Sequence, residues 1–506
     1  MEGSNTVRHQ RFRMNWVREC PLIMMLLLFV STSRIVCCAT DDFEHCENTV
    51  LNWATSSLND GAEEDKLMLK DLLFFLHVPR TGGRTYFYCF LKKLYTTAEE
   101  CPRSYDRLRF DPSQPHCKLV GTHDDFSLMS KLPKERTSVV TILRNPIDRI
   151  FSTYEFSVEV AARFLVHPNL TSAMKLSLRL RSKKQGVSTL DIWPWKYLVP
   201  WMREDLFGRR EARKSRLESV EIDKDWDTYN MEDIVMPLRD FIKDPMAHDI
   251  IHNGATFQVA GLTNNSRLAE SNEIRLCVRK HPSLGHHVLD VAKRRLDDML
   301  YVGLTEDHKQ SATMFANMVG AQVLSQMEAL SSHTDEESTN NTGLEPYSSK
   351  VLQNRTKDQK ATDLFAPENV EQANENMTVA QLMEAYEACV SNTRKSQASR
   401  RTNSLKRISP VKFSKEARLQ VPETIIEQIK SLNSLDMELY NHAQDIFLQQ
   451  KQHLTQKAEV EPQMNTGSNA FWFSPWKALM IVIVLLFLFL IIFIVNTRKK
   501  MSKLKV

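Results

Sequence analysis

The stretch Leu72–Leu94, LLFFLHVPRTGGRTYFYCFLKKL, decides the fold of this chain. Leu72–Val78 is an apolar run of strand length with two aromatic residues and no helix cap. Pro79–Arg84 (PRTGGR) has the composition of a turn, and the apolar spacing of Thr85–Leu94 suits a helix. The order strand, glycine turn, helix is therefore predicted for this segment.

The turn in this segment has the features of an anion site. Gly82 and Gly83 let the backbone approach a ligand closely, and Arg80 and Arg84 add positive charge. Backbone N–H groups at the start of the helix favour an anion as well. The pattern GxxxxGK[ST] is absent, so this is not the phosphate loop of the NTPases. Taken alone, the stretch is equally well explained as a buried strand followed by a glycine turn.

A second stretch has the same predicted order of a strand, a turn and a helix. Ser138–Ser152 reads SVVTILRNPIDRIFS, in which Val139–Leu143 is a buried strand that ends at Arg144. Asn145 and Pro146 break the strand, and a helix is predicted from Ile147 onward. Two such units predict an α/β fold, a mostly parallel sheet flanked by helices, with the ligand at the carboxyl ends of the strands.

The two stretches together resemble the signature of sulfotransferases that use 3′-phosphoadenosine 5′-phosphosulfate (PAPS). The resemblance implies that Arg144 and Ser152 hold the 3′-phosphate of this co-substrate. It implies that the first turn holds the 5′-phosphosulfate through Arg80, Thr81, Gly82, Gly83, Arg84 and Thr85. The fold implied is the P-loop-like PAPS-dependent sulfotransferase fold.

Five collinear blocks extend the resemblance to the heparan sulfate 6-O-sulfotransferase family, and a weaker block spans Asp240–Leu262. The five are HVPRTGGRT (His77–Thr85), GTHDDFSLM (Gly121–Met129), TILRNPIDRIFS (Thr141–Ser152), YVGLTEDHKQSATMF (Tyr301–Phe315) and LNSLDMELYNHAQDIF (Leu432–Phe447). Arg80 stands where that family usually has lysine, and residues 165–235 and 331–420 have no clear counterpart. The heparan enzymes are anchored at the N-terminus, whereas this chain has a C-terminal apolar run. That combination resembles the plant protein-tyrosine sulfotransferases, which are type I Golgi proteins.

The resemblance assigns two catalytic residues, Arg80 and His123. Arg80 would stabilise the charge that develops on the bridging oxygen of the phosphosulfate, since a guanidinium stays cationic. His123 matches the catalytic histidine of the family and would act as the base, with His77 as its rival. Asp124 and Asp125 follow His123 and would raise its pKa if they lie near it in space.

The Tyr301–Lys309 segment has two readings. In one it closes over the nucleotide, with Thr305 and Lys309 as contacts. In the other it is a strand end that packs on the sheet. Leu432–Phe447 is expected to be a packing helix rather than part of a site, because its apolar periodicity explains it fully.

The chain has 506 residues, and its composition divides it into segments. A basic N-terminus followed by a short apolar run predicts a signal peptide over 1–39. A lead-in of irregular structure (40–70) precedes the catalytic domain (71–330), and a polar, disordered and glycosylated insertion is predicted over 331–421, with one helix at Thr378–Val390. A catalytic-domain helix (422–453) and a stem (454–475) follow. The apolar run Ala478–Val495 predicts a transmembrane helix over 476–495, and 496–506 is a basic tail placed in the cytosol.

The cysteines and the charged residues allow further predictions about disulfides and partners. Nine cysteines are present; Cys101 and Cys117 bracket a Pro-containing loop and form the favoured disulfide, whereas Cys89 is expected to be a buried free thiol. No spacing suggests a metal site. The net charge of +4 is too small to indicate a nucleic-acid partner. The insertion Leu178–Asp233 places tryptophans between basic clusters and is either a solvated surface or a groove for an acidic partner.

The expected function is sulfation of tyrosine hydroxyls in secreted acidic peptides and proteins by PAPS, in the lumen of the Golgi apparatus. The enzyme alternative is 6-O-sulfation of a heparan-like polysaccharide. The third reading is a membrane-tethered binding protein on a sulfotransferase fold without activity. Retention of Arg80, His123, Arg144 and Ser152 argues against that third reading.

Overall fold

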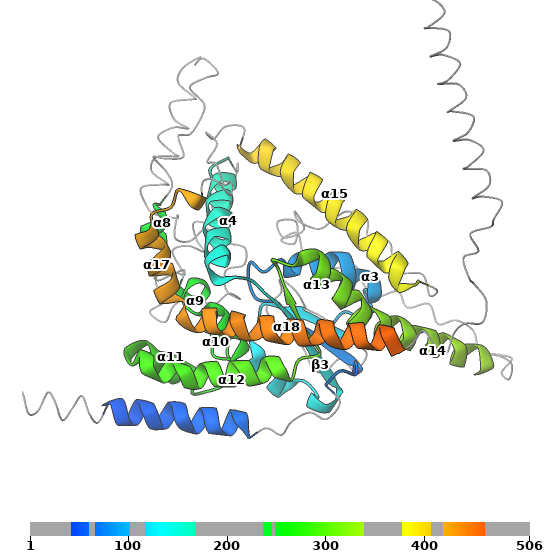
Figure 1. Ribbon diagram of the computed structural model, residues 1–506, viewed down its shortest axis with the longest axis horizontal. Helices are drawn as coiled ribbons and strands as arrows, with labels where there is room; N and C mark the ends of the chain where they lie inside the picture. Colours follow the sequence, from blue (N-terminus) through cyan, green and yellow to red (C-terminus); the bar gives the residue numbers. More distant parts are fainter. Residues whose placement is uncertain are drawn as a thin grey trace, which may run out of the picture. The chain divides into compact units, whose positions relative to one another are not determined.

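The computed structural model describes residues 42–59, 66–101, 117–166, 236–244, 248–337, 377–405 and 418–460. Its centre is a sheet of four parallel strands in the order β2-β1-β3-β4, surrounded by helices (Figure 1). The strands are β1 (Leu72–Leu76), β2 (Leu119–Thr122), β3 (Thr137–Leu143) and β4 (Tyr301–Leu304). The predicted α/β fold with a parallel sheet is thereby confirmed.

The strands are mostly apolar, without alternation, because the sheet is buried on both faces. Every residue of β1, β2, β3 and β4 is buried. β1 lies between β2 and β3, with Phe74 opposite Val120 on one side and Val139 on the other. A parallel sheet with both faces covered requires such strands rather than an alternation of apolar and polar residues.

The helices fall into three groups along the chain. The first group comprises α2 (Gly83–Tyr86), the π-helix η1 (Phe87–Leu91), α3 (Lys92–Leu94), the 3-10 helices η2 (Phe126–Lys131) and η3 (Lys134–Arg136), and α4 (Pro146–Val166). The second comprises α8 (Leu238–Phe241), α9 (His248–Ile251), α10 (Gly254–Val259), α11 (Ser271–Lys280), the 3-10 helix η7 (Pro282–Leu284) and α12 (Gly285–Asp297). The third comprises α13 (His308–Phe315), the π-helix η8 (Ala316–Gly320), α14 (Ala321–Glu337), α15 (Val379–Leu405), α17 (Glu423–Leu432) and α18 (Ser434–Val460).

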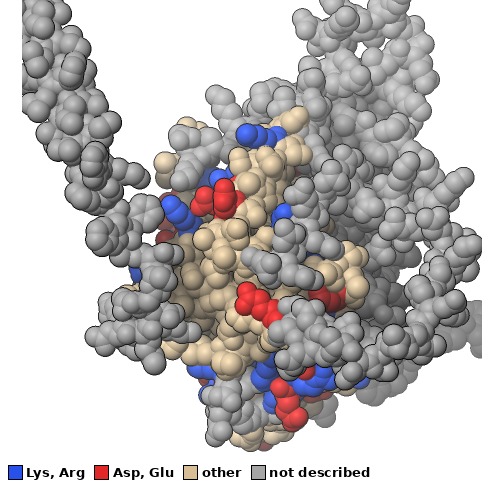
Figure 2. All heavy atoms as spheres, turned by 90° about the vertical axis from the view of Figure 1, so that its right-hand side faces the viewer, with Lys and Arg blue, Asp and Glu red and all other residues tan. Residues whose placement is uncertain are grey.

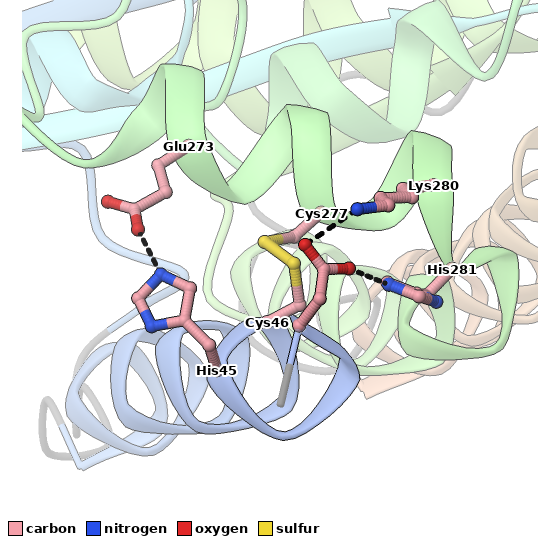
Figure 3. The surroundings of a disulfide bond; sticks show 7 residues. His45, Cys46, Glu273, Cys277, Lys280 and His281 are labelled. Atoms are coloured by element: carbon pink, nitrogen blue, oxygen red, sulfur yellow. Dashed lines mark hydrogen bonds and ion pairs between the residues drawn. A yellow bond between two sulfur atoms is a disulfide. The ribbon is translucent and has the colours of Figure 1, made fainter. Parts of the chain in front are cut away.

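The lead-in contains a helix, at residues 42–58, so the predicted irregular structure of this segment is wrong. Its buried residues, Cys46, Val50 and Trp53, recur at helical spacing, and the acidic composition hid this pattern. A disulfide joins Cys46 to Cys277 of α11 (Figure 3). Beside the disulfide, Asp42 accepts hydrogen bonds from Lys280 at 2.6 Å and His281 at 2.9 Å.

A second disulfide corrects the prediction for Cys89. Cys89, in η1, is bonded to Cys389 of α15, and is therefore not a free thiol. α15, the long yellow helix in Figure 1, lies in the segment that was expected to be a disordered insertion. A helix was predicted there over Thr378–Val390, and it extends to Leu405. Its apolar face packs on the core, because Leu382, Tyr386 and Val390 are buried one turn apart.

The third disulfide, Cys101–Cys117, is the pair that the sequence favoured. Several predicted segments lie outside the described residues: the signal peptide, the basic Leu178–Asp233 insertion, the stem from residue 461 onward, the C-terminal apolar run and the basic tail. Residues 454–460, which were predicted to begin the stem, instead continue α18. Within the described residues, no helix combines the length and apolar character that a membrane crossing needs.

Candidate active site

The predicted site residues meet at one edge of the sheet because they follow the carboxyl ends of its strands. His77 lies just after β1, His123 directly follows β2, Arg144 directly follows β3 and Thr305 directly follows β4. The ladder continues past the strands, since His77 N–H donates to Thr122 O at 3.0 Å. This edge is where α/β sheets bind their ligands.

The loop after β1 is held in an unusual backbone conformation. Arg80 has φ +69° and Gly82 has φ +82°, both in the left-handed region, which is costly for a residue with a side chain. Thr81 Oγ1 donates to Val78 O at 2.9 Å and closes the turn. Thr305 Oγ1 donates to Thr81 O at 2.6 Å and fixes the loop to the end of β4. Strain that is kept in place by such contacts is typical of binding loops.

Gly83 is required by a neighbouring side chain. A Cβ at this position would lie 2.3 Å from His77 Cδ2 and 2.9 Å from Phe75 Cζ. The His77 ring therefore occupies the space that any side chain at position 83 would need. No side chain caps the start of α2 within the described part of the chain, so the helix presents its first N–H groups at the same point.

The two histidines lie against each other, with ring centroids 4.2 Å apart. His123 Nδ1 is 3.1 Å from the backbone oxygen of His77. A carbonyl oxygen can only accept, so His123 Nδ1 carries the hydrogen, and the neutral ring keeps its lone pair on Nε2. Burial, together with the positive charges nearby, holds the pKa of His77 well below 6.5. His77 is thus a neutral packing partner, while His123 has the tautomer that a base needs.

Gln258, in α10, holds the backbone of both histidine segments. Its Nε2 lies 3.1 Å from His77 O, 3.2 Å from His123 O and 3.1 Å from Asp124 O, and its side chain is buried. Sequence reasoning placed this residue in a weaker block but gave it no role. The signal was a lone amide in the apolar run Thr256–Leu262.

The two aspartates that follow His123 differ in role. Asp125 accepts from Ser127 N–H at 3.0 Å and caps η2, and it accepts from Thr263 N–H at 2.8 Å and Thr263 Oγ1 at 2.6 Å. These bonds fix the segment after β2. Burial and the neighbouring Asp125 raise the pKa of Asp124 to about 6.

The structure brings the second predicted stretch onto the first. Arg80 Nε and Nη2 donate to Ser152 Oγ at 3.2 and 3.0 Å, and the Arg80 guanidinium stacks over the Phe156 ring at 4.3 Å. Arg144 Nη1 donates to Arg80 O at 3.2 Å. Burial lowers the pKa of Arg144. Arg80, Arg144 and Ser152 therefore form one cationic group at this edge of the sheet.

The remaining residues predicted to contact the donor differ in where they lie. Arg84 and Thr85 lie in the first turn after the loop, where Thr85 N–H donates to Gly82 O at 2.9 Å and Arg84 stacks over Tyr88 at 5.2 Å. Thr305 supports the loop, as above. Lys309 is exposed in α13, and within the described residues its side chain makes no hydrogen bond or ion pair to the loop.

The sequence patterns did not predict a buried ion pair that lies behind the site. Arg149 Nη2 donates to Asp436 Oδ2 at 2.7 Å, and both side chains are 1% exposed. Asp436 also accepts from Thr256 N–H at 2.7 Å and Ala255 N–H at 3.2 Å. The Leu432–Phe447 block packs on the core, as predicted, although it is broken at Asn433 between the end of α17 and the start of α18. Through Asp436 it also anchors α4 and α10.

No family model matches the chain. A curated protein of Arabidopsis thaliana named "Protein-tyrosine sulfotransferase" is 52% identical over 510 residues, covering 98% of this chain and 100% of that protein. The chain belongs to the protein-tyrosine sulfotransferase family. The resemblance to plant protein-tyrosine sulfotransferases that the sequence suggested is thus confirmed.

Groups suited to a polyanionic sulfuryl donor are present in this member of the protein-tyrosine sulfotransferase family. The Arg80–Thr85 loop and the Arg144–Ser152 segment offer guanidinium, hydroxyl and backbone N–H groups that converge on one edge of the sheet. Metal-ligand side chains form one cluster in the described residues, Asp42, Cys46 and His281. The sulfur of Cys46 is already bonded to Cys277.

Proposed function

We propose that this protein transfers the sulfuryl group of PAPS to tyrosine hydroxyls of peptides and proteins. The observation that carries the proposal is the pair His123 and Arg80, a base in the required tautomer and a fixed cation at the same edge of a parallel sheet. The identity to the Arabidopsis thaliana protein supports it, because the match covers nearly the whole chain.

PAPS supplies the sulfuryl group and the leaving phosphate. The Arg80–Thr85 loop would hold the 5′-phosphosulfate through its N–H groups, since anions bind at helix starts. Arg144 and Ser152 would hold the 3′-phosphate. Arg80 is already hydrogen-bonded to Ser152, so one contact links the two ends of the donor site.

The acceptor proton would go to His123. A tyrosine phenol has a pKa of about 10 and is protonated at neutral pH, so a base assists its attack. As the phenol oxygen bonds to sulfur, the bond from sulfur to the bridging phosphate oxygen breaks and the phenol proton moves to His123 Nε2. Arg80 stabilises the charge on the leaving oxygen. His77 and Gln258 hold His123 in position for this transfer.

We further propose a type I topology in the Golgi membrane, with the body of the protein in the lumen. The three disulfides of the described residues fit an oxidising compartment, and the Ala478–Val495 run followed by basic residues fits a C-terminal span. Protease added to intact microsomes should remove a C-terminal tag and leave the body protected. A tag that survives the protease would contradict the orientation.

The acceptor is proposed to carry acidic residues beside the tyrosine. On the face shown in Figure 2, the Lys/Arg and Asp/Glu side chains of described residues lie interspersed rather than in a patch of one sign. The segment proposed to recognise these acidic residues is the insertion Leu178–Asp233, because its sequence is basic and contains tryptophans; it lies outside the described residues.

The test uses the full chain, labelled PAPS and three acceptors: an Asp-Tyr peptide, its Ala-Tyr version and desulfated heparan. Label should enter the phenol of the Asp-Tyr peptide, with a higher KM for the Ala-Tyr version. Transfer to heparan with none to either peptide would reject the tyrosine function. Equal rates and KM values for the two peptides would keep the reaction and reject the reading of acidic residues.

A further inference from the structure

Glu306 lies beside Arg144, the residue that is proposed to hold the donor's 3′-phosphate. It follows Thr305 after β4, and its side chain is 33% exposed. Its Oε1 accepts from Asn145 N–H at 3.1 Å and lies 3.9 Å from Arg144 Nε. Its Oε2 accepts from Tyr440 Oη, in α18, at 2.8 Å. The carboxylate is therefore held from three sides.

This position is one that an anion prefers. Asn145 caps α4 by accepting from Ile147 N–H at 3.0 Å, so its own N–H, which Glu306 accepts, lies just before the positive end of a long helix. Arg144, on the same side, is largely buried and donates from Nη1 to Arg80 O. Two independent features, the helix start and the arginine, thus converge on the carboxylate of Glu306.

We propose that Glu306 is a built-in competitor of the 3′-phosphate for Arg144 and the start of α4. The inference rests on the proposed function, in which Arg144 holds that phosphate. A bound 3′-phosphate and the Glu306 carboxylate carry like charges in the same small space, and like charges at short range repel. The repulsion weakens the binding of the donor and, to the same extent, the binding of the desulfated product, adenosine 3′,5′-bisphosphate. Tyr440 keeps the carboxylate close, so that it returns when the product leaves.

The simpler reading is that Glu306 only orients Arg144. The two readings predict opposite signs for Glu306→Gln. The glutamine keeps an oxygen for Asn145 N–H and a polar group for Tyr440 Oη, but removes the charge. If Glu306 competes, adenosine 3′,5′-bisphosphate binds more tightly; if it orients Arg144, the ligand binds more weakly.

The experiment measures dissociation constants by calorimetry on the detergent-solubilised full chain, with adenosine 3′,5′-bisphosphate and adenosine 5′-monophosphate. Glu306→Gln should tighten the bisphosphate by about tenfold, equivalent to ~1.4 kcal/mol, and leave the monophosphate unchanged. Asp307→Asn is the matched control, since it removes the same charge one residue further along. Unchanged or weaker bisphosphate binding, equal tightening of both nucleotides, or equal tightening by the control would each overturn the proposal.

The same assay separates this inference from the proposed function. If the wild-type chain sulfates the tyrosine peptide and Arg144→Ala weakens the bisphosphate, the function stands. Under those conditions a Glu306→Gln variant without tightening rejects only the role of Glu306. A wild-type chain that neither binds the bisphosphate nor transfers label rejects both.

Discussion

Replacing Gly83 with alanine should slow sulfuryl transfer, because the new side chain displaces His77 and, with it, His123. The new Cβ would lie 2.3 Å from His77 Cδ2, whereas ordinary contact begins at 3.4 Å, so the ring must move by about 3.4 − 2.3 = 1.1 Å. His77 has little room, because Phe75 stacks on it at 5.5 Å and His123 packs against it at 4.2 Å. The displacement therefore passes to His123, whose Nδ1 bonds to His77 O.

A displacement of roughly 1 Å at a reacting group costs about 10²-fold in rate. We expect kcat of Gly83→Ala to fall by that order in the assay with labelled PAPS and the Asp-Tyr peptide. Gly82→Ala is the control: its Cβ has no neighbour closer than 3.9 Å, so it strains the loop at φ +82° without touching either histidine. A folded Gly83→Ala protein with wild-type kcat would refute the argument, as would an equal loss of kcat in both variants at unchanged nucleotide affinity.

Three further predictions concern stability. Asp436→Ala should lower the free energy of unfolding by about 3–5 kcal/mol, since it leaves Arg149 buried without its counter-charge; chemical denaturation that shows a change below 1 kcal/mol, on the order of a surface pair, contradicts this. Cys389→Ser should lower the melting temperature more than substitutions at exposed positions away from the disulfide do, because a disulfide that closes so long a loop contributes about 2–4 kcal/mol to the free energy of unfolding. Added reductant should then lower the melting temperature of this variant less than that of the wild type. His252 should contribute a loss of stability as the pH drops below 6.5 toward 4, because burial lowers its pKa to about 4 and the unfolded chain takes up that proton first. Asp124, whose pKa is raised to about 6, acts in the opposite direction over this window, so the measurement compares the wild type with His252→Gln at each pH. The difference in melting temperature between the two proteins should change as the pH falls, with the wild type losing stability relative to the variant, and a constant difference would count against the prediction.

The sequence predicted the parts of the site that are contiguous in the chain. A strand, a turn and a helix within Leu72–Leu94 and again within Ser138–Ser152 follow from local composition alone. Because parallel strands end at one edge, the residues after them could be expected to meet there, and Arg80 does meet Ser152.

The contacts that the sequence did not predict join residues far apart in the chain. Gln258 reaches His77 across 181 positions, and Arg149 reaches Asp436 across 287. Local periodicity carries no information on such partners, and a buried polar residue in an apolar run is only a hint that a partner exists. The prediction that Cys89 is a free thiol failed for the same reason, since its disulfide partner lies 300 residues away in a segment with a polar composition.

The central claim is that His123, and not His77, takes the phenol proton. The direct measurement is the single-turnover rate of sulfuryl transfer from labelled PAPS to the Asp-Tyr peptide, with adenosine 3′,5′-bisphosphate affinity measured on the same preparations. His123→Ala should lower the rate by about 10²–10⁴ while the bisphosphate affinity persists. A wild-type rate for His123→Ala, together with that loss in His77→Ala, would contradict the account.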